Sequence, residues 1–237
     1  MKAVSTVGDS FEIFQREDSF KFGTDAVLLA HFARVRHKDV LYDFCSGTGA
    51  VGFFCHLLYR PKTIGFVEID ETMCTLSKQT AIHNGIASKC RFFCSDIADF
   101  DPKNIEDGID CITVNPPYFL RDSGKQNQNP NLAQARHTEH FSYRTLFSKA
   151  YDALKDGGKL FLIQRVQNFS EILYEMRCHK IEPKRIRMVH SYADKEAMLF
   201  LAEGVKNGGV WMDCMPPLIL YEADGTPTQE FFHMQQF

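Results

Sequence analysis

The chain has 237 residues, of which 44% are hydrophobic and 24% charged, and its net charge is −3. This length and balance fit one globular core, and the charge excludes a protein that binds polyanions through a generally basic surface. No apolar leader opens the chain and no run approaches the ~20 apolar residues that cross a bilayer, so we expect a cytoplasmic protein without membrane contact. Eight cysteines are scattered without a CxxC pair, which favours reduced thiols and no bound metal.

The chain is predicted to begin with a β-hairpin. Residues 10–15 and 19–22 alternate apolar and polar side chains on either side of a charged turn. Thr24 precedes a helical run that continues to Ala33, and we expect it to cap this helix, with Asp25 in the first turn where the helix dipole favours an acid.

Strands and helices alternate along the middle of the chain. Strand-like runs lie at residues 39–45, 63–69, 90–95, 109–114 and 158–163, and helical patterns at 49–60, 71–84, 142–155 and 168–179. Such alternation predicts an α/β fold in which helices cover both faces of a parallel sheet. The runs at 186–190 and 197–202 are joined by a turn too short for a parallel crossover, so we expect them to pair antiparallel.

Residues 121–140 form a long polar stretch rich in Asn, Gln and Ser. A loop of this length inside a compact domain is either disordered or functional, and we interpret it as a substrate-gripping loop. We expect one domain over residues 1–237, with residues 1–23 as a hairpin extension and 205–237 as a tail, and we expect a monomer.

A glycine-containing turn follows the strand that begins at Val40. It carries Gly47 and Gly49, as in dinucleotide-binding folds, where glycine lets a ligand approach the backbone. Only two glycines are in register and no Gly-Lys-Ser/Thr follows, which disfavours NAD and a phosphate-binding loop. Asp43 would repel a pyrophosphate but suits an ammonium group, so the turn favours S-adenosylmethionine.

Two further acids end the next two strands. Glu68 lies where an acid binds a ribose diol in such folds, and Asp96 can accept a hydrogen bond from the adenine amine of the cofactor. Each acid alone is as well explained as a helix cap, but three at successive strand ends mark the edge where open α/β sheets bind ligands. The predicted cofactor site comprises Asp43, Cys45, Gly47, Gly49, Glu68, Ile69, Asp96, Ile97 and Asn115.

The strongest motif is Asn115-Pro116-Pro117-Tyr118, where a buried strand stops at two prolines that cannot continue a β-ladder. The Asn115 side chain and the Pro116 carbonyl can then form a rigid pair of acceptors for an aromatic amine. Bonds to both amine hydrogens localise the nitrogen lone pair for attack on a methyl group and strengthen as the nitrogen becomes positive. Tyr118 offers a stacking face worth ~1–3 kcal/mol per base. We predict these four residues as the catalytic group, with a plain Asn-Pro turn as the weaker alternative.

Asn-Pro-Pro-Tyr is typical of class I amino-group methyltransferases, and nearly the whole chain resembles the bacterial tRNA1(Val) adenine-N6 methyltransferases. The resemblance is carried by residues 22–30, 135–137, 183–190 and 216–221, with Gly225. It implies a Rossmann-like fold with a mostly parallel seven-stranded sheet and an antiparallel C-terminal hairpin. The implied reaction is methylation of adenosine 37 in the anticodon loop of a valine tRNA.

The resemblance also implies roles for particular residues. Phe22, Gly23, Thr24 and Asp25 would lie against the cofactor, and Asn115 to Tyr118 would hold the target amine. Cys45 stands where many relatives have glycine, and as a small residue we expect it to be tolerated. The tail around Gly225 lacks the aromatic residue that usually precedes the family's threonine.

Basic side chains gather at residues 177–190 and recur in the polar loop. A solvated charged face is the commoner explanation for such clusters, and phosphate contacts are the alternative, which would make binding weaken with salt. The predicted substrate contacts are Tyr118, Arg121, Arg136, Lys184, Arg185 and Arg187.

Three other functions share these features. A protein methyltransferase acting on glutamine carries the same motif but usually has an extra N-terminal helical domain. A DNA adenine methyltransferase usually has a target-recognition domain, which we do not find in the sequence. A non-catalytic RNA-binding or assembly module is disfavoured by the intact Asn115 and Tyr118.

Overall fold

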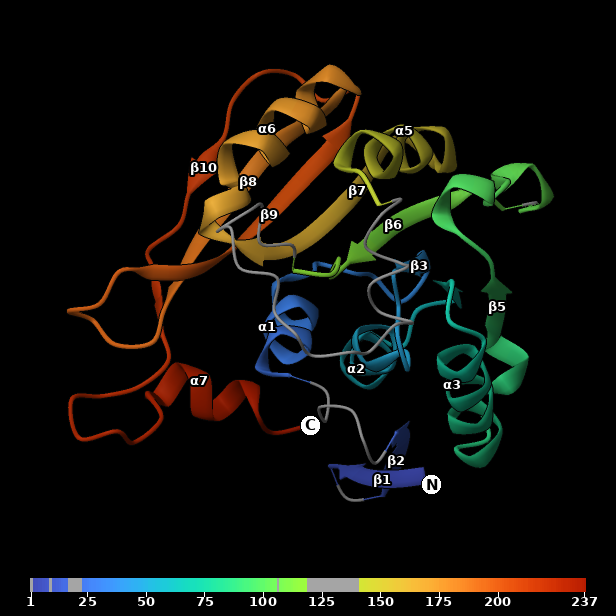
Figure 1. Cartoon of the computed structure of the whole chain (residues 1–237), viewed down its shortest axis with the longest axis horizontal. Helices are drawn as coiled ribbons and strands as arrows, with labels where there is room; N and C mark the ends of the chain where they lie inside the picture. Colours follow the sequence, from blue (N-terminus) through green and yellow to red (C-terminus); the bar gives the residue numbers. More distant parts are fainter. Residues whose placement is uncertain (1, 9, 17–22, 106, 119–140) are drawn as a thin grey trace, which may run out of the picture.

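A computed structural model of the chain describes residues 2–8, 10–16, 23–105, 107–118 and 141–237. Its centre is one sheet with the strand order β10-β8-β9-β7-β6-β3-β4-β5, and β11 also pairs with β8 (Figure 1). The strands are β3 (Val40–Phe44), β4 (Thr63–Glu68), β5 (Cys90–Cys94), β6 (Ile109–Val114), β7 (Leu154–Arg165), β8 (Ile181–His190), β9 (Ala197–Lys206), β10 (Asp213–Cys214) and β11 (Leu218–Ile219).

The directions of the strands confirm the predicted fold class. β5, β4, β3, β6 and β7 run parallel, and β9 runs antiparallel to both β7 and β8. The two-residue strands β10 and β11 add to the seven strands that we expected. β7 is also longer than its sequence pattern indicated, and begins directly after the preceding helix.

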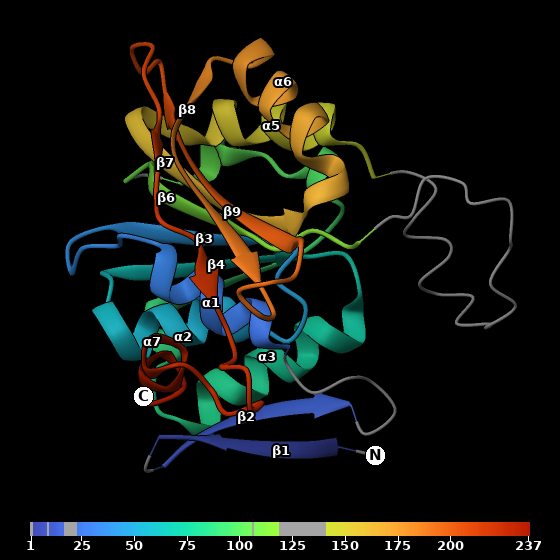
Figure 2. The ribbon, with the colours of Figure 1, turned by 90° about the vertical axis from the view of Figure 1, so that its left-hand side faces the viewer.

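Helices cover both faces of this sheet (Figure 2). They are α1 (Thr24–Phe32), α2 (Ala50–Tyr59), α3 (Glu71–His83), α5 (Tyr143–Ala153), α6 (Phe169–Cys178) and α7 (Gln229–Met234). Figure 2 shows α5 and α6 on one face and α1, α2 and α3 on the other. Alternate side chains of β3 therefore enter different cores: Tyr42 and Phe44 pack towards α5, and Leu41 packs with α1 and α2.

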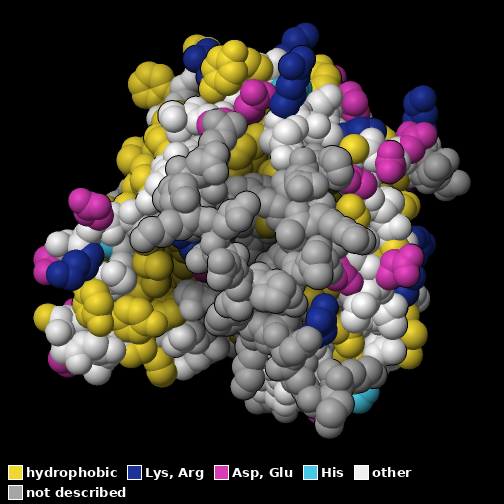
Figure 3. All heavy atoms as spheres, in the orientation of Figure 1, with side chains coloured by type: hydrophobic (Ala, Val, Ile, Leu, Met, Phe, Trp, Pro, Cys, Tyr) yellow, Lys and Arg dark blue, Asp and Glu magenta, His cyan; other side chains and the backbone are white. Residues whose placement is uncertain are grey.

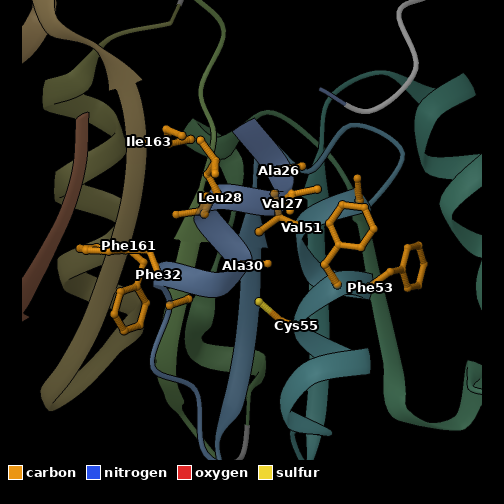
Figure 4. Packing of buried hydrophobic residues seen from close by; sticks show 14 of the residues in the cluster. Ala26, Val27, Leu28, Ala30, Phe32, Val51, Phe53, Cys55, Phe161 and Ile163 are labelled. Atoms are coloured by element: carbon orange, nitrogen blue, oxygen red, sulfur yellow. The ribbon is translucent and has the colours of Figure 1, made fainter. Parts of the chain in front are cut away.

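The core on the α1 side is filled by aromatic and branched side chains (Figure 4). Phe32 at the end of α1 meets Phe161 of β7 edge to face, with ring centroids 6.4 Å apart. On the other flank, Phe53 of α2 packs against Phe66 of β4 at 4.8 Å. This burial holds α1 between β7 and α2, and so fixes where its first turn lies.

Among the described helices, none has the length and apolarity needed to cross a bilayer.

The N-terminal hairpin differs from the prediction. Its strands are β1 (Lys2–Val7) and β2 (Phe11–Arg16), which pair antiparallel; the expected second strand, residues 19–22, lies outside the described residues. The hairpin is held on α3 through backbone amides, since Phe14 N donates to Thr80 Oγ1 and Glu12 N donates to Asn84 Oδ1, each at 3.0 Å. Thr24 is also not a helix cap as expected: Gly23 takes that position and Thr24 is the first residue of α1.

The expectation that all cysteines are reduced is wrong for one pair. Cys74 in α3 and Cys94 at the end of β5 form a disulfide, with their Cα atoms 6.0 Å apart. α3 packs beside β5, and this contact brings together two residues that are 20 positions apart in sequence. The other six cysteines are free.

Candidate active site

The carboxyl ends of β4, β3 and β6 lie next to each other at one edge of the sheet, because these strands are parallel neighbours. The turn after β3 holds Cys45, Gly47 and Gly49 in the left-handed region, with φ of 54°, 55° and 84°. A Cβ on Gly49 would lie within 3.0 Å of Phe53, Ser77 and Phe66, so close packing as well as backbone conformation requires glycine there. Apart from Gly47 and its two chain neighbours, no atom of the described residues lies within 4 Å of the corresponding point at Gly47. The turn is therefore packed on its inner side and open at Gly47, which fits the close approach of a cofactor.

Cys45 lies within the electrostatic influence of the three predicted acids. Burial raises the pKa of its thiol well above the usual value, and the charges of Glu68, Asp43 and Asp96 raise it further. The thiol is therefore neutral, and the acids from three successive strands are near enough to act on one side chain. Its backbone is in the left-handed region, with φ of 54°, a conformation that favours glycine.

Asp43 is buried and bonded to other parts of the protein. This structural role replaces the expected ion pair between Asp43 and an ammonium group. It is 1% exposed, its Oδ1 accepts a hydrogen bond from the Thr113 hydroxyl at 2.8 Å, and its Oδ2 accepts one from Gly52 N at 3.1 Å. Desolvation raises its pKa to about 7, against the lowering effect of these two bonds. Asp43 thus joins β3 to β6 and to the first turn of α2, and shapes the glycine turn from within.

Glu68 connects the glycine turn to the loop after β4. Its Oε2 accepts from Gly47 N at 2.7 Å and its Oε1 accepts from Asp70 N at 2.9 Å. Desolvation raises the pKa of Glu68, opposed by these backbone bonds. Each carboxylate oxygen retains a second lone pair, so the side chain can still accept from a hydroxyl at the open side of the turn. Contact with a ribose stays a prediction.

The remaining predicted cofactor residues follow β4 and β5. Ile69 is an unusually exposed apolar side chain, 39% accessible, directly after Glu68. Asp96 begins a 3₁₀ turn, where its Oδ1 accepts from Ala98 N at 2.8 Å, and Ile97 is buried beneath it. An exposed apolar residue beside two carboxylates suits a nucleoside, whose base is flat and apolar and whose edges are polar.

Asn115 to Tyr118 follow β6 at the same edge of the sheet. Asn115 is half-buried and Pro116 is buried, and the Asn115 amide has no hydrogen-bond partner among the described residues. The Tyr118 hydroxyl donates to the Asp25 carboxylate in the first turn of α1. The guanidinium of Arg165, at the end of β7, lies 5.3 Å from the centre of the Tyr118 ring. The motif is thus held by α1 and β7, and its amide remains available to a substrate.

Gly23, Thr24 and Asp25, at the start of α1, lie in different surroundings. Asp25 reaches Tyr118, whereas Gly23 and Thr24 line a cavity of about 320 Å³ between the N-terminal hairpin, α1 and α7. Phe22 lies outside the described residues. Only Asp25 therefore connects this segment directly with the catalytic motif in the described structure.

Two of the predicted RNA contacts have partners within the protein. Arg185 donates to Glu203 at 2.8 Å and to the Phe32 carbonyl at 2.8 Å, and Arg187 makes a bidentate pair with Glu230 at 2.6 and 2.8 Å. Both are less than 10% exposed, so we no longer propose them as phosphate contacts. The basic cluster predicts an exposed surface, but both side chains are turned inward on β8.

Of the other predicted RNA contacts, the structure describes Lys184 and Tyr118. Lys184 is half-buried and donates to the Gly209 carbonyl at 2.9 Å, and Arg121 and Arg136 lie outside the described residues. On the face in Figure 3, the visible Lys and Arg side chains are scattered, with acidic side chains among them. Sequence reasoning missed Gln164 and Arg165 at the end of β7. The available signal was two long polar side chains directly after an apolar strand.

The family model for the methyltransferase small domain matches residues 12–178. This range contains the glycine turn, the three acids and the Asn-Pro-Pro-Tyr motif. The chain belongs to this family. Its fold agrees: a predicted O-methyltransferase of Agrobacterium tumefaciens has a TM-score of 0.69, with 18% identity and coverage of 89% of this chain and 95% of that one. Geranyl diphosphate C-methyltransferase of Streptomyces coelicolor, solved with S-adenosyl-L-homocysteine, has a TM-score of 0.55 at 16% identity, covering 76% and 78%.

Among curated proteins, this member of the methyltransferase small domain family is similar to enzymes named tRNA1(Val) (adenine(37)-N6)-methyltransferase. That of Vibrio vulnificus strain YJ016 is 30% identical over 149 residues, which are 63% of this chain and 60% of the relative. That of Shewanella sp. strain W3-18-1 is 25% identical over 217 residues, which are 90% and 89% of the two chains. The match thus spans somewhat less than two thirds of the Vibrio protein and most of the Shewanella protein.

Proposed function

We propose that the protein transfers a methyl group from S-adenosylmethionine to the N6 amine of an adenine in RNA, at adenosine 37 in the anticodon loop of a valine tRNA. The observation that carries this proposal is the position of Asn115 to Tyr118 beside the turn that contains Gly47, whose amide donates to Glu68 at the end of β4. The similar curated proteins carry this activity in their names. A cytoplasmic monomer stays a prediction from the sequence.

The residues present suit the cofactor and the reaction. Glu68, Asp96 and the exposed Ile69 would hold its nucleoside, next to the open side of Gly47, and the bound cofactor supplies a methyl group on a sulfonium. The Asn115 Oδ1 and the Pro116 carbonyl would accept the two hydrogens of the adenine amine. These bonds withdraw the lone pair from conjugation with the ring and strengthen as positive charge grows on nitrogen, so they favour the transition state. The methylated nitrogen is acidic enough to lose its proton to water.

The target base would stack on Tyr118. It has to leave its own stack to do so, which costs less in an anticodon loop than in a duplex. Arg165 lies against the same ring, so we add it to Lys184, Arg121 and Arg136 as proposed contacts with the RNA. Those contacts would make binding weaken as salt increases.

In the decisive experiment, the protein is incubated with S-adenosylmethionine that carries a labelled methyl group. Bulk tRNA, total protein and duplex DNA are offered as methyl acceptors in separate reactions. We expect label in tRNA, and nuclease mapping should assign it to adenosine 37 of a valine tRNA. Asn115→Ala should abolish the transfer while S-adenosylmethionine binding, measured by calorimetry, is nearly unchanged. Labelled protein with unlabelled tRNA would establish glutamine methylation in place of our proposal, and full activity of Asn115→Ala would overturn the mechanism.

A further inference from the structure

The main-chain pairing between β6 and β7 stops where the catalytic motif begins. Val114, the last residue of β6, pairs with Leu162, but β7 continues to Arg165. Pro116 and Pro117 have no amide hydrogen, so they cannot donate to β7 as ordinary strand residues would. The β6–β7 pairing also ends before their carbonyls.

Gln164 lies in the part of β7 that continues beyond the end of β6. Its side-chain Nε2 is 3.3 Å from the Pro116 carbonyl oxygen and 3.5 Å from that of Pro117. Its Oε1 accepts the backbone N–H of Arg165 at 2.8 Å. Because an amide oxygen cannot donate, this third contact fixes the nitrogen on the side of the prolines.

The surroundings of Gln164 are apolar and closed to solvent. The residue is 0% exposed, as are its neighbour Ile163 and its cross-strand partner Phe200. Burial of a primary amide is unfavourable unless its polar atoms are bonded within the protein. The contacts with the prolines and Arg165 supply those bonds, so the orientation of the amide and that of the Pro116 carbonyl depend on each other.

We propose that Gln164 is a positioning residue for methyl transfer, which aims the Pro116 carbonyl at the amine of the substrate. The inference rests on the proposed function and deepens it. A carbonyl oxygen has two lone pairs, so it can accept from Gln164 and from the amine together. Misplacing such an acceptor lowers the rate of the chemical step and leaves both binding equilibria almost unchanged.

The test compares Gln164→Leu and Gln164→Glu with the wild type. Gln164→Leu keeps the approximate size but removes the donor, and we expect kcat to fall roughly 10- to 100-fold, as for a reacting group misplaced by about 1 Å. The dissociation constants for cofactor and RNA should change less than about threefold.

In Gln164→Glu a carboxylate would repel the Pro116 carbonyl, whereas a protonated carboxyl can donate to it. Its kcat relative to wild type should therefore recover as pH falls, which a merely structural role does not predict.

Phe200→Leu is the matched control, because it loosens the same part of the core without touching the prolines. Its thermal unfolding should shift at least as much as that of Gln164→Leu, while its kcat stays near the wild-type value. Equal kcat losses in Gln164→Leu and Phe200→Leu, or wild-type kcat in Gln164→Leu, would overturn the proposal. The kinetics use whichever acceptor the wild-type enzyme labels, so a wrong assignment of RNA as substrate is detected separately.

Discussion

The Tyr118 hydroxyl donates a hydrogen bond to the Asp25 carboxylate, and this single contact joins the end of the catalytic motif to the first turn of α1. The two residues are 93 positions apart. Burial raises the pKa of Tyr118 and the adjacent Asp25 charge raises it further, so the phenol stays protonated and remains a donor. The orientation of the ring on which we expect the base to stack is thus set by α1.

This contact predicts different effects for two substitutions at Tyr118. Tyr118→Phe keeps the ring and loses the bond, so we expect a several-fold loss of activity. Tyr118→Ala loses the stacking face as well, which should raise the dissociation constant for RNA by the equivalent of ~1–3 kcal/mol. Both are measured by steady-state kinetics and by RNA binding at constant salt.

A double-mutant cycle tests whether Asp25 acts through Tyr118. Asp25→Ala should reduce activity in the wild-type background and have little further effect in Tyr118→Phe, because the bond is already absent there. Fully additive effects would show that Asp25 acts elsewhere, for example on the cofactor.

Glu68→Gln should weaken cofactor binding. The amide can accept from only one of the two backbone donors, Gly47 N and Asp70 N, and turns a donor towards the other. We expect the dissociation constant for S-adenosylmethionine, from calorimetry, to rise about 10- to 100-fold, equivalent to ~1.4–2.7 kcal/mol. Glu71→Gln, an exposed acid three residues later, is the control and should bind normally. Unchanged affinity of Glu68→Gln would refute the role of this carboxylate.

The buried Asp43 predicts how stability depends on pH. Its folded pKa is raised to about 7, so between pH ~4 and ~7 the native state binds more protons at this site than the unfolded state. The contribution of Asp43 therefore lowers the free energy of unfolding as pH rises through this window, by up to ~1.4 kcal/mol per pH unit. Urea unfolding of Asp43→Asn at several pH values should give a flatter profile there. An unchanged profile would contradict the raised pKa.

The Cys74–Cys94 disulfide should stabilise the fold by about 3 kcal/mol, because it closes a loop of roughly 20 residues in the unfolded chain. Cys94→Ser should lose this amount in urea unfolding, and reductant should lower the stability of the wild type but not of the variant. Cys178→Ser, which removes a free exposed cysteine, should behave like the wild type. Alkylation of the denatured, unreduced protein should modify six thiols; eight would show that the bond is absent.

The sequence by itself determined the features that depend on local chain chemistry. Alternating strand and helix patterns predicted the parallel sheet and its antiparallel C-terminal pair. The prolines at 116 and 117 marked the end of the strand that stops at Val114, whereas the ligand-binding edge indicated by the acids near other strand ends stays a prediction. The inferences about the fold hold because periodicity, proline and glycine restrict the backbone wherever they occur.

Only the tertiary structure decided which distant side chains meet. The sequence predicts Arg187 as a phosphate ligand, but in the structure it pairs with Glu230, 43 residues later. The sequence predicts Asp43 as a ligand of the cofactor, but in the structure it is buried against Thr113. Gln164 carried no motif at all. Each role depends on which neighbour the packed core brings within hydrogen-bond distance, and that is a property of the whole fold that no local pattern encodes.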